Sequence, residues 1–204
     1  MITHTIITAC SRPENLETIY QSILSETNTG FKVVWNIIHD SVPTPELLEI
    51  KNKLINWGDY FVINHYYHIN SNSIIGNSQK NTGIALASEN SYLYFLDDDN
   101  ILIPGFFNEV NVAIVNNPDK LIFIGDQILP NGTIRLFGSP ENTKVDHIDL
   151  AQYIIHSSIA NQVEFEISYY NADGRYIEKL YNMYKDRTYF FKETICFYNY
   201  LRNE

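Results

Sequence analysis

The sequence predicts an α/β domain built on a mostly parallel central sheet, with helices on both faces and a smaller antiparallel part in the C-terminal half. Strand-like and helix-like segments alternate through the first half of the chain, which is the order of parallel βα units. A Pro-Asn-Gly turn between two further strand candidates indicates a hairpin in the second half. The length of 204 residues and the hydrophobic content of 45% suffice for one well-buried domain.

The expected strands of the first half are short apolar runs bounded by polar residues. They cover residues 5–9, 31–38, 60–64 and 92–96. Helices are expected between and after these strands, connected by right-handed crossovers. They follow residues 11–14, cover about 45–56, run from the polar stretch 70–77 through Ser88, and follow Pro104.

The first and last of these helices carry clear apolar stripes. Ser11-x-x-Glu14 matches a capping box, and Pro13 falls in the first helical turn. The next apolar residues match the core-facing spacing of a helix: Leu16, Ile19, Tyr20, Ile23 and Leu24. After Pro104, a common apolar face is formed by Phe106, Phe107, Val110, Ala113 and Ile114.

The second half begins with the hairpin, whose strands are expected at residues 121–129 and 133–137. Its Asn131-Gly132-Thr133 also matches a glycosylation sequon, but in a cytoplasmic chain the turn is the favoured interpretation. A loop, an apolar segment, a helix and a last strand are then expected at residues 139–143, 149–159, 174–184 and 189–198. One side of that helix carries Ile177, Leu180, Tyr181 and Tyr184.

Composition narrows the possible partners and the compartment. A net charge of −10 with only 14 Lys and Arg argues against nucleic acid or an anionic membrane as the main partner. No run approaches the roughly 20 apolar residues of a membrane span, and the N-terminus lacks the pattern of a signal peptide. Cys10 and Cys196 are too few for a disulfide scaffold, which favours a reducing compartment. We therefore expect a cytoplasmic protein.

Three consecutive aspartates, Asp97 to Asp99, follow the apolar run at residues 92–96 and are the most informative feature of the chain. In open α/β sheets, ligands bind beyond the carboxyl ends of the strands. If side chains alternate along an extended backbone, Asp97 and Asp99 face one ligand and Asp98 faces away. Such carboxylates suit Mg²⁺ or Mn²⁺ that is shared with a diphosphate. The alternative is a strand that ends in a solvated acidic turn.

With these elements in place, the chain resembles the GT-A glycosyltransferases, in particular small inverting enzymes similar to glycosyltransferase family 2. The resemblance extends over residues 1–204 as one domain, with a nucleotide-sugar-binding half at 1–103 and an acceptor-binding half at 104–204. It rests on residues 8–13 (TACSRP), Asp40, residues 76–83 (GNSQKNTG), residues 95–99 (FLDDD, the D-x-D element) and residues 171–174 (NADG).

The resemblance implies a role for each matching residue in the donor site. Thr8 and Arg12 would lie near the base or ribose, and Asp40 would bind the uracil or ribose. Arg12 could instead be a solvated helix-start residue, and Asp40 a turn or cap residue before Pro43. In the D-x-D element, Asp97 would contact the ribose and Asp99 would hold the metal. Nucleotide-sugar contacts are also expected from Gly76 and Asp98. Both Asp97 and Asp99 are expected to bind the metal.

Lys80 is unusual on physical grounds because it lies near the start of a helix. A cation there is disfavoured by roughly 0.3–1 kcal/mol against the helix dipole, so an anionic or carbonyl group is expected beside it. The resemblance implies a basic residue against the nucleotide base at this position. A solvent-facing lysine that tolerates the penalty is the alternative.

Asp173 matches the general base that takes a proton from the acceptor hydroxyl. It also directly precedes the predicted helix at 174–184, where it would make a good N-cap. The sequence departs from the commoner Glu-Asp pair because Ala172 stands before the aspartate, which weakens the assignment. An acceptor-facing cluster is implied nearby, and a histidine in it could add a metal ligand: His147, Asp149, Gln152 and His156.

The function expected from these residues is metal-dependent transfer of a hexose from a nucleoside-diphosphate sugar, best a UDP-sugar, to a carbohydrate or other hydroxyl acceptor, with inversion. The cofactor would be Mn²⁺ or Mg²⁺. One alternative is a haloacid-dehalogenase-type phosphatase, whose D-x-D motif normally lies on the first strand and needs a later acidic pair. The other is a catalytically silent module that binds a sugar nucleotide.

Overall fold

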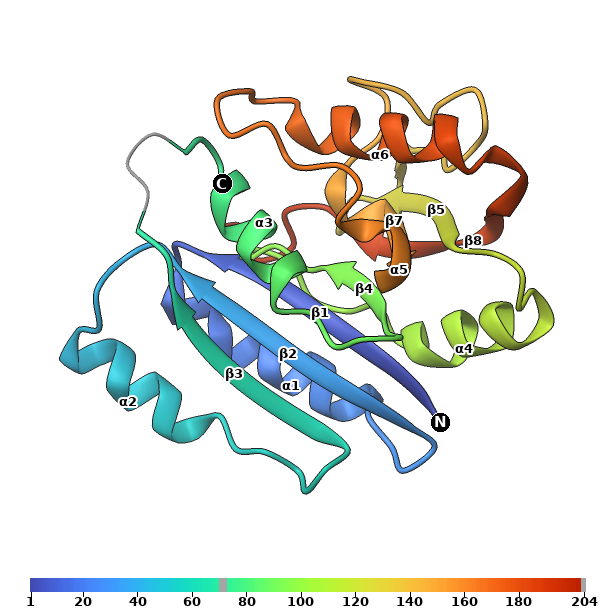
Figure 1. Ribbon diagram of the computed structural model, residues 1–204. Coiled ribbons are helices and arrows are strands. Elements are labelled where there is room, and N and C mark those ends of the chain that lie inside the picture. Colours follow the sequence, from blue (N-terminus) through green and yellow to red (C-terminus); the bar gives the residue numbers. More distant parts are fainter. Residues whose placement is uncertain (70–72, 203–204) are drawn as a thin grey trace.

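The computed structural model describes residues 1–69 and 73–202, and its centre is one eight-stranded sheet (Figure 1). Neighbouring strands follow the order β3-β2-β1-β4-β7-β5-β6, and β8 pairs with β5. The strands are β1 (Ile2–Cys10), β2 (Phe31–His39), β3 (Phe61–Tyr67), β4 (Tyr92–Phe95), β5 (Ile122–Ile128), β6 (Ile134–Leu136), β7 (Tyr153–His156) and β8 (Thr188–Phe197).

The helices are α1 (Leu16–Glu26), α2 (Pro45–Lys53), α3 (Asn77–Ala85), α4 (Phe106–Asn116), α5 (Ser157–Ala160) and α6 (Ala172–Met183). Short 3-10 turns occur at η1 (Pro13–Asn15), η2 (Leu150–Gln152) and η3 (Lys185–Arg187). Within residues 1–69 and 73–202, no helix is both long and apolar enough to cross a membrane. The first three positions of the expected polar stretch 70–77 lie outside the described residues.

The sheet is mostly parallel and has an antiparallel part formed by C-terminal strands, as the sequence predicts; beyond β4, among the described residues, only β8 pairs in parallel, with β5. β3, β2, β1 and β4 pair in parallel, whereas β7 pairs antiparallel with both β4 and β5. The hairpin is also confirmed, because β5 and β6 are antiparallel and Gly132 adopts a φ of 84° in the turn between them. The carboxyl ends of the parallel strands lie at the same edge of the sheet, and the candidate site lies at this edge.

Alternation along the strands produces one apolar core on each face of the sheet. Ile6 and Tyr94 belong to the cluster beneath α1 and α4, whereas their neighbours Ile7 and Phe95 belong to the cluster beneath α6. Figure 1 shows α1 behind β1 and β2, with α3 in front of them. Helices therefore cover both faces, as expected.

The expected capping box at Ser11 is wrong. α1 begins at Leu16 after η1, and its N-cap residue, Asn15, makes no side-chain cap. The Ser11 hydroxyl instead donates to the Asp98 carboxylate at 3.0 Å. A contact across 87 positions of sequence therefore replaces the local hydrogen bond that the pattern suggests.

Several boundaries also differ from the predictions. α2 ends at Lys53 and α3 ends at Ala85, before the predicted positions 56 and 88. The apolar segment 149–159 divides into η2, β7 and α5, with β7 inserted between β4 and β5. α6 begins at Ala172 rather than residue 174, which changes the position of Asp173.

α3 lies close to the sheet because Gly83 and the N-cap residue Gly76 have no side chain. A Cβ atom on Gly83 would lie 2.3 Å from Ile7 Cγ2, and one on Gly76 would lie 2.6 Å from Ala9 Cβ. Gly76 also has a φ of 68°, in the left-handed region that favours glycine. The N-terminal turn of α3 therefore lies directly over the end of β1.

Candidate functional site

A cavity of about 750 Å³ opens at the carboxyl ends of β1, β2 and β4, with further walls from α3, β6, α6 and residues 198–202. This is the edge where α/β sheets bind ligands. The cavity brings together most of the residues that the sequence assigns to the donor site and the reaction. These are Arg12, Asp40, Gly76, Lys80, Asp97, Asp98, Asp99 and Asp173.

Thr8 is separated from this group, so its placement near the base or ribose is corrected. The side chain is fully buried within the sheet, where its hydroxyl donates to the Leu96 carbonyl at 2.8 Å and accepts from Trp35 Nε1 at 2.9 Å. Position 8 is still inside β1, two residues before the strand ends at Cys10 and the loop that lines the cavity begins. Thr8 therefore joins strands and does not face a ligand.

Asp40 lies at the cavity directly after β2 and has an exposed side chain. Its backbone N–H donates to the Cys10 carbonyl at 3.2 Å, which holds the ends of β1 and β2 together. The alternative role as a helix cap is not observed, because the side chain of Thr44 caps α2 by accepting from Leu47 N. Asp40 is therefore available as an acceptor for a ligand.

The alternation expected for the three aspartates is wrong. β4 ends at Phe95, and Asn100 N donates to the Asp97 carbonyl at 3.0 Å, so the aspartates lie in a turn rather than on an extended strand. The rule of alternating faces therefore does not apply to them. Asp98 and Asp99 both contact Arg12, and Asp97 lines the cavity separately.

Asp98 holds the loop between β1 and η1. Its Oδ2 accepts from the backbone N–H groups of Ser11 at 2.6 Å and of Arg12 at 2.7 Å. Its Oδ1 accepts from Arg12 Nε at 2.9 Å and also from Nη2. Both oxygens are used, so this carboxylate fixes Arg12 and the loop that forms one wall of the cavity.

Asp99 is only 3% exposed and shares one oxygen between two guanidinium groups. Its Oδ2 lies 3.0 Å from Arg12 Nη2 and 2.8 Å from Arg202 Nε. Within the described residues, its Oδ1 has no hydrogen-bond partner. Asp99 therefore has one oxygen paired with arginine and one oxygen open to a further cation.

Asp97 is the one residue of the three consecutive aspartates whose carboxylate has no partner in the described residues. Its side chain lines the cavity and, among residues 1–69 and 73–202, receives no hydrogen bond or ion pair. Burial raises the pKa of Asp97 well above its usual range, and nearby Lys80 opposes that shift, while Asp173 and Asp99 add to it. An added cation at this position would stabilise the ionised form.

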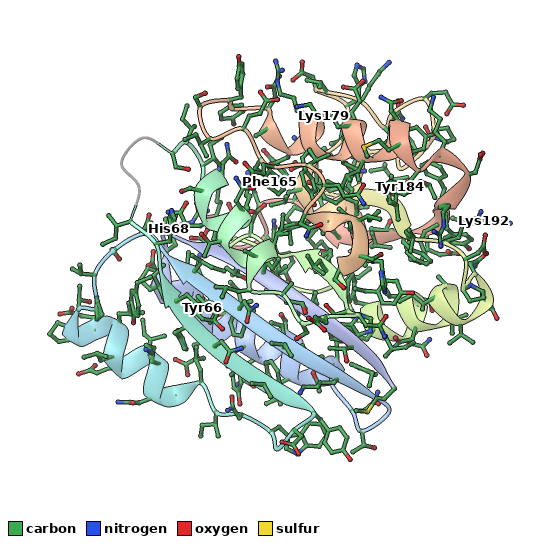
Figure 2. All side chains as sticks on the ribbon, in the orientation of Figure 1. Tyr66, His68, Phe165, Lys179, Tyr184 and Lys192 are labelled. Atoms are coloured by element: carbon green, nitrogen blue, oxygen red, sulfur yellow. The ribbon has the colours of Figure 1, made fainter. Side chains whose placement is uncertain are left out.

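The start of α3 brings Lys80 into a buried ion pair. Its Nζ lies 2.9 Å from Asp173 Oδ1, and the lysine is 2% exposed. The ammonium also lies 5.5 Å from the ring centroid of Phe165, which Figure 2 shows between α3 and α6. The anionic partner expected on dipole grounds is therefore present, and the solvent-facing alternative is excluded.

The pair keeps opposite charges together inside the protein. Burial by itself lowers the pKa of Lys80, but Asp173 and Asp97 outweigh it, so the net pKa is raised. Burial raises the pKa of Asp173, and Lys80 limits that rise. Lys80 thus favours the ionised carboxylate, the form that a general base requires.

Asp173 is not the N-cap of its helix, which corrects the alternative structural role. α6 has Asn171 at the N-cap, and Asp173 lies inside the first helical turn. A carboxylate there is favoured by the helix dipole, and its side chain extends to Lys80 rather than to the backbone. α6 has no side-chain hydrogen bond at its N-cap, and the Asp173 carboxylate is used in the ion pair instead.

Of the four residues proposed for the acceptor side, only Asp149 lines the cavity. His147 is exposed elsewhere, and Gln152 is buried, donating to the Gly125 carbonyl at 3.0 Å. The ring of His156 contacts Asn90 Oδ1 at 3.2 Å on the far side of β7. The expected cluster is therefore corrected to Asp149 alone, and neither histidine is placed to ligate a metal in this cavity.

Sequence reasoning missed two arginines that line the cavity. Arg135 of β6 lies 2.7 Å from Asp149 Oδ2 and stacks 3.6 Å from the ring centroid of Tyr198. Arg202 reaches Asp99 from the segment after β8. Neither lies in a recognisable motif, because the hairpin and the last segment enter the site only through long-range packing.

The charges around the cavity leave it short of cations. Among the described lining residues, seven aspartates face four cations, and each cation is already paired with an aspartate. Within the same residues, no group of three or more His, Cys, Asp or Glu side chains could hold a metal by itself. Asp97 and the open oxygen of Asp99 offer two carboxylate ligands, and a Mg²⁺ or Mn²⁺ ion held there would take its remaining ligands from water and phosphate.

Comparison with known proteins identifies the fold. No protein-family model matches the sequence, and no curated protein matches it. Among solved structures, S. aureus TarS 1–349 matches with a TM-score of 0.67 and 15% identity, covering 97% of this chain and 60% of that one. Its complex with UDP-GlcNAc matches with a TM-score of 0.68 and 14% identity, covering 97% and 58%. A longer TarS structure matches with a TM-score of 0.63 and 14% identity, covering 97% and 36%.

The chain therefore has the GT-A fold that its motifs suggest. It spans 60% of the length of TarS 1–349, so the match covers a shared domain rather than that whole chain. At 15% identity the likeness concerns the fold, and function must be argued from the site.

Proposed function

We propose that this chain is a glycosyltransferase that moves a hexose from a nucleoside-diphosphate sugar to a hydroxyl acceptor. The observation that carries the proposal is the arrangement of carboxylates in one cavity of a GT-A fold. Asp97 and Asp99 stand without full pairing at the end of β4, and Asp173 stands with Lys80 at the start of α6. One pair suits a cation and diphosphate, and the other suits proton removal.

Donor binding would use the wall formed by the first two strands. Asp40 offers an exposed acceptor for an imide N–H or a ribose hydroxyl, and the loop carrying Arg12 is held rigid by Asp98. Because one TarS structure is a complex with UDP-GlcNAc, a UDP-sugar is the first donor to test. Gly76 lets the start of α3 approach the end of β1 closely, and both segments line this part of the cavity.

Mg²⁺ or Mn²⁺ is proposed as the cofactor, held by Asp97 and the open oxygen of Asp99. When bound, it would neutralise charge on the departing nucleoside diphosphate. The protein's own contribution is to keep Asp97 accessible to the cavity and Asp99 oriented by Arg12. Burial raises the pKa of Asp97, and a bound cation would act in the opposite direction by favouring the ionised carboxylate.

Asp173 is proposed to accept the proton of the acceptor hydroxyl as that oxygen attacks the anomeric carbon. Attack from the side opposite the leaving group would invert the configuration of the sugar. Lys80 would position the Asp173 carboxylate by its 2.9 Å contact and keep it ionised. This assigns Lys80 to the base and the acceptor side rather than to the nucleotide base.

The two alternatives differ in their support. A haloacid-dehalogenase-type phosphatase is disfavoured because Asp97 follows the fourth strand of a GT-A fold, whereas the phosphatase motif lies on the first strand. A silent binding module would share the fold and the cavity. Turnover of the donor separates that module from the enzyme.

Thermal shifts with UDP-, GDP- and dTDP-sugars, each with and without Mn²⁺, test the proposed function. We expect one nucleotide series to raise the melting temperature by about 5–10 °C at a hundredfold excess over Kd, and only with Mn²⁺ present. The physical reason is that ligand binding stabilises the folded state alone. If none of the three series shifts the transition, the chain is not a nucleotide-sugar enzyme.

A further inference from the structure

The four cations among the described residues of the cavity wall are not equally available to a ligand. Lys80 is buried against Asp173, and the Arg12 guanidinium is held by Asp98 Oδ1 and by Asp99 Oδ2. Arg135 is fixed between Asp149 and the face of Tyr198. Each of these three has its charge and its orientation already committed.

Arg202 is different in both exposure and contacts. Its side chain is 54% exposed, and the atom that touches Asp99 is Nε, at 2.8 Å. Within the described residues, its terminal Nη1 and Nη2 groups have no hydrogen-bond or ion-pair partner. These two groups form the planar fork that binds phosphate oxygens in pairs.

Asp99 does not depend on Arg202 for its counterion. The same Oδ2 atom also lies 3.0 Å from Arg12 Nη2, so a guanidinium stays beside it if Arg202 moves. An unpaired buried carboxylate would make the release of Arg202 costly. Because Arg12 remains beside Asp99, this cost does not arise.

The backbone beside Arg202 is held at the aspartate turn. Leu201 N donates to the Asp99 carbonyl at 2.7 Å, and Tyr200 N donates to Asn100 Oδ1 at 3.1 Å. The Tyr200 ring packs on Phe197, with centroids 4.8 Å apart. The guanidinium can therefore change partners by rotating its own side chain, without displacement of the segment that carries it.

We propose that Arg202 is a diphosphate-binding residue that rests on Asp99 in the free protein and transfers to the donor's diphosphate when it binds. The inference rests on the proposed function, because the diphosphate is that of the nucleotide sugar. A diphosphate entering a cavity rich in aspartates needs a cation that is free to move. Arg202 meets this need at the point where the β4 aspartates end.

Isothermal titration of the wild-type chain and of Arg202→Gln with UDP, GDP, dTDP and the matching free nucleosides, all with Mn²⁺, tests the assignment. For the diphosphate that binds most tightly, the variant should bind about 10–100-fold more weakly, the range expected for lost charged hydrogen bonds. Binding of the free nucleoside should change less than twofold, because it has no phosphate. Arg202→Lys should retain part of the affinity, as a cation without the fork.

The control is Lys192→Gln, which removes the same charge from an exposed position of β8, far from α3 in Figure 2. It should leave every affinity unchanged. The melting temperature of Arg202→Gln without ligand should also stay close to that of the wild type, since Arg202 is more than half exposed and Arg12 remains beside Asp99. Equal diphosphate affinity in the wild type and Arg202→Gln overturns this inference alone. A wild-type chain that binds none of the three diphosphates overturns the proposed function as well.

Discussion

Replacing Asp173 by Asn should reduce sugar transfer by about 10²–10⁴-fold, the usual contribution of a general base. The amide is nearly the same size as the carboxylate but cannot accept the acceptor's proton. Donor binding should change little, because the Asp173 carboxylate pairs with Lys80 and is not one of the two carboxylates proposed to hold the cation. The measurement is release of nucleoside diphosphate from the donor that the thermal shifts select, together with a binding titration of that donor.

Asp146→Asn is the matched control for this variant. Asp146 lines the same cavity and is exposed, and its Oδ1 accepts only from Asn171 Nδ2 at 3.1 Å within the described residues. Its φ of 67° is one that Asn tolerates, so the fold should be unaffected. Normal turnover in Asp173→Asn would show that the carboxylate serves only to pair with Lys80.

Replacing Lys80 by Met should destabilise the fold by about 3 kcal/mol at neutral pH, because a buried carboxylate loses its counterion. Asp173 is the partner left behind, and its carboxylate has no other hydrogen bond or ion pair with the described residues. Transfer should also fall, because a base that is more often protonated removes protons less often. Urea unfolding of the two chains at several pH values measures the loss of stability.

The loss of stability should shrink in acid, and its sign follows from proton linkage. Without Lys80, burial raises the pKa of Asp173 in the folded state above its value in the unfolded state. At a pH between these two pKa values, the folded state therefore binds more protons than the unfolded state. Stability of the variant therefore falls as the pH rises through that window and recovers below it. The double variant Lys80→Met/Asp173→Asn should regain most of the stability at neutral pH. A deficit that is equal in the single and double variants and independent of pH would contradict this account of the pair.

The order of strands and helices could be predicted because each element has its own apolar pattern. The stripe from Leu16 to Ile23 and the alternation of Ile6 with Ile7 each identify one element and its buried side. The insertion of β7 between β4 and β5 could not be predicted, since strand order depends on packing between distant segments. The same cause defeated the local rule at Ser11, whose hydroxyl bonds to Asp98 rather than to its own helix.

The candidate site was predicted where its residues lie in motifs and missed where they do not. Asp97 and Lys80 were found because an acidic strand end and a cation at a helix start are visible in the sequence. Arg135 and Arg202 were missed because each is a single arginine in a polar segment, and only the fold brings it to the cavity. Thr8 was misplaced because the end of β1 cannot be located to within two residues from its pattern.

The central claim is that a divalent cation binds beside Asp97 and Asp99 and holds a nucleoside diphosphate in the cavity. Crystals soaked with Mn²⁺ and UDP, measured at the manganese absorption edge, test it most directly. We expect an anomalous peak about 2.1 Å from an Asp97 oxygen, with diphosphate oxygens completing its coordination. A diphosphate bound without a peak at these aspartates, or an absence of both from the cavity, would contradict the claim.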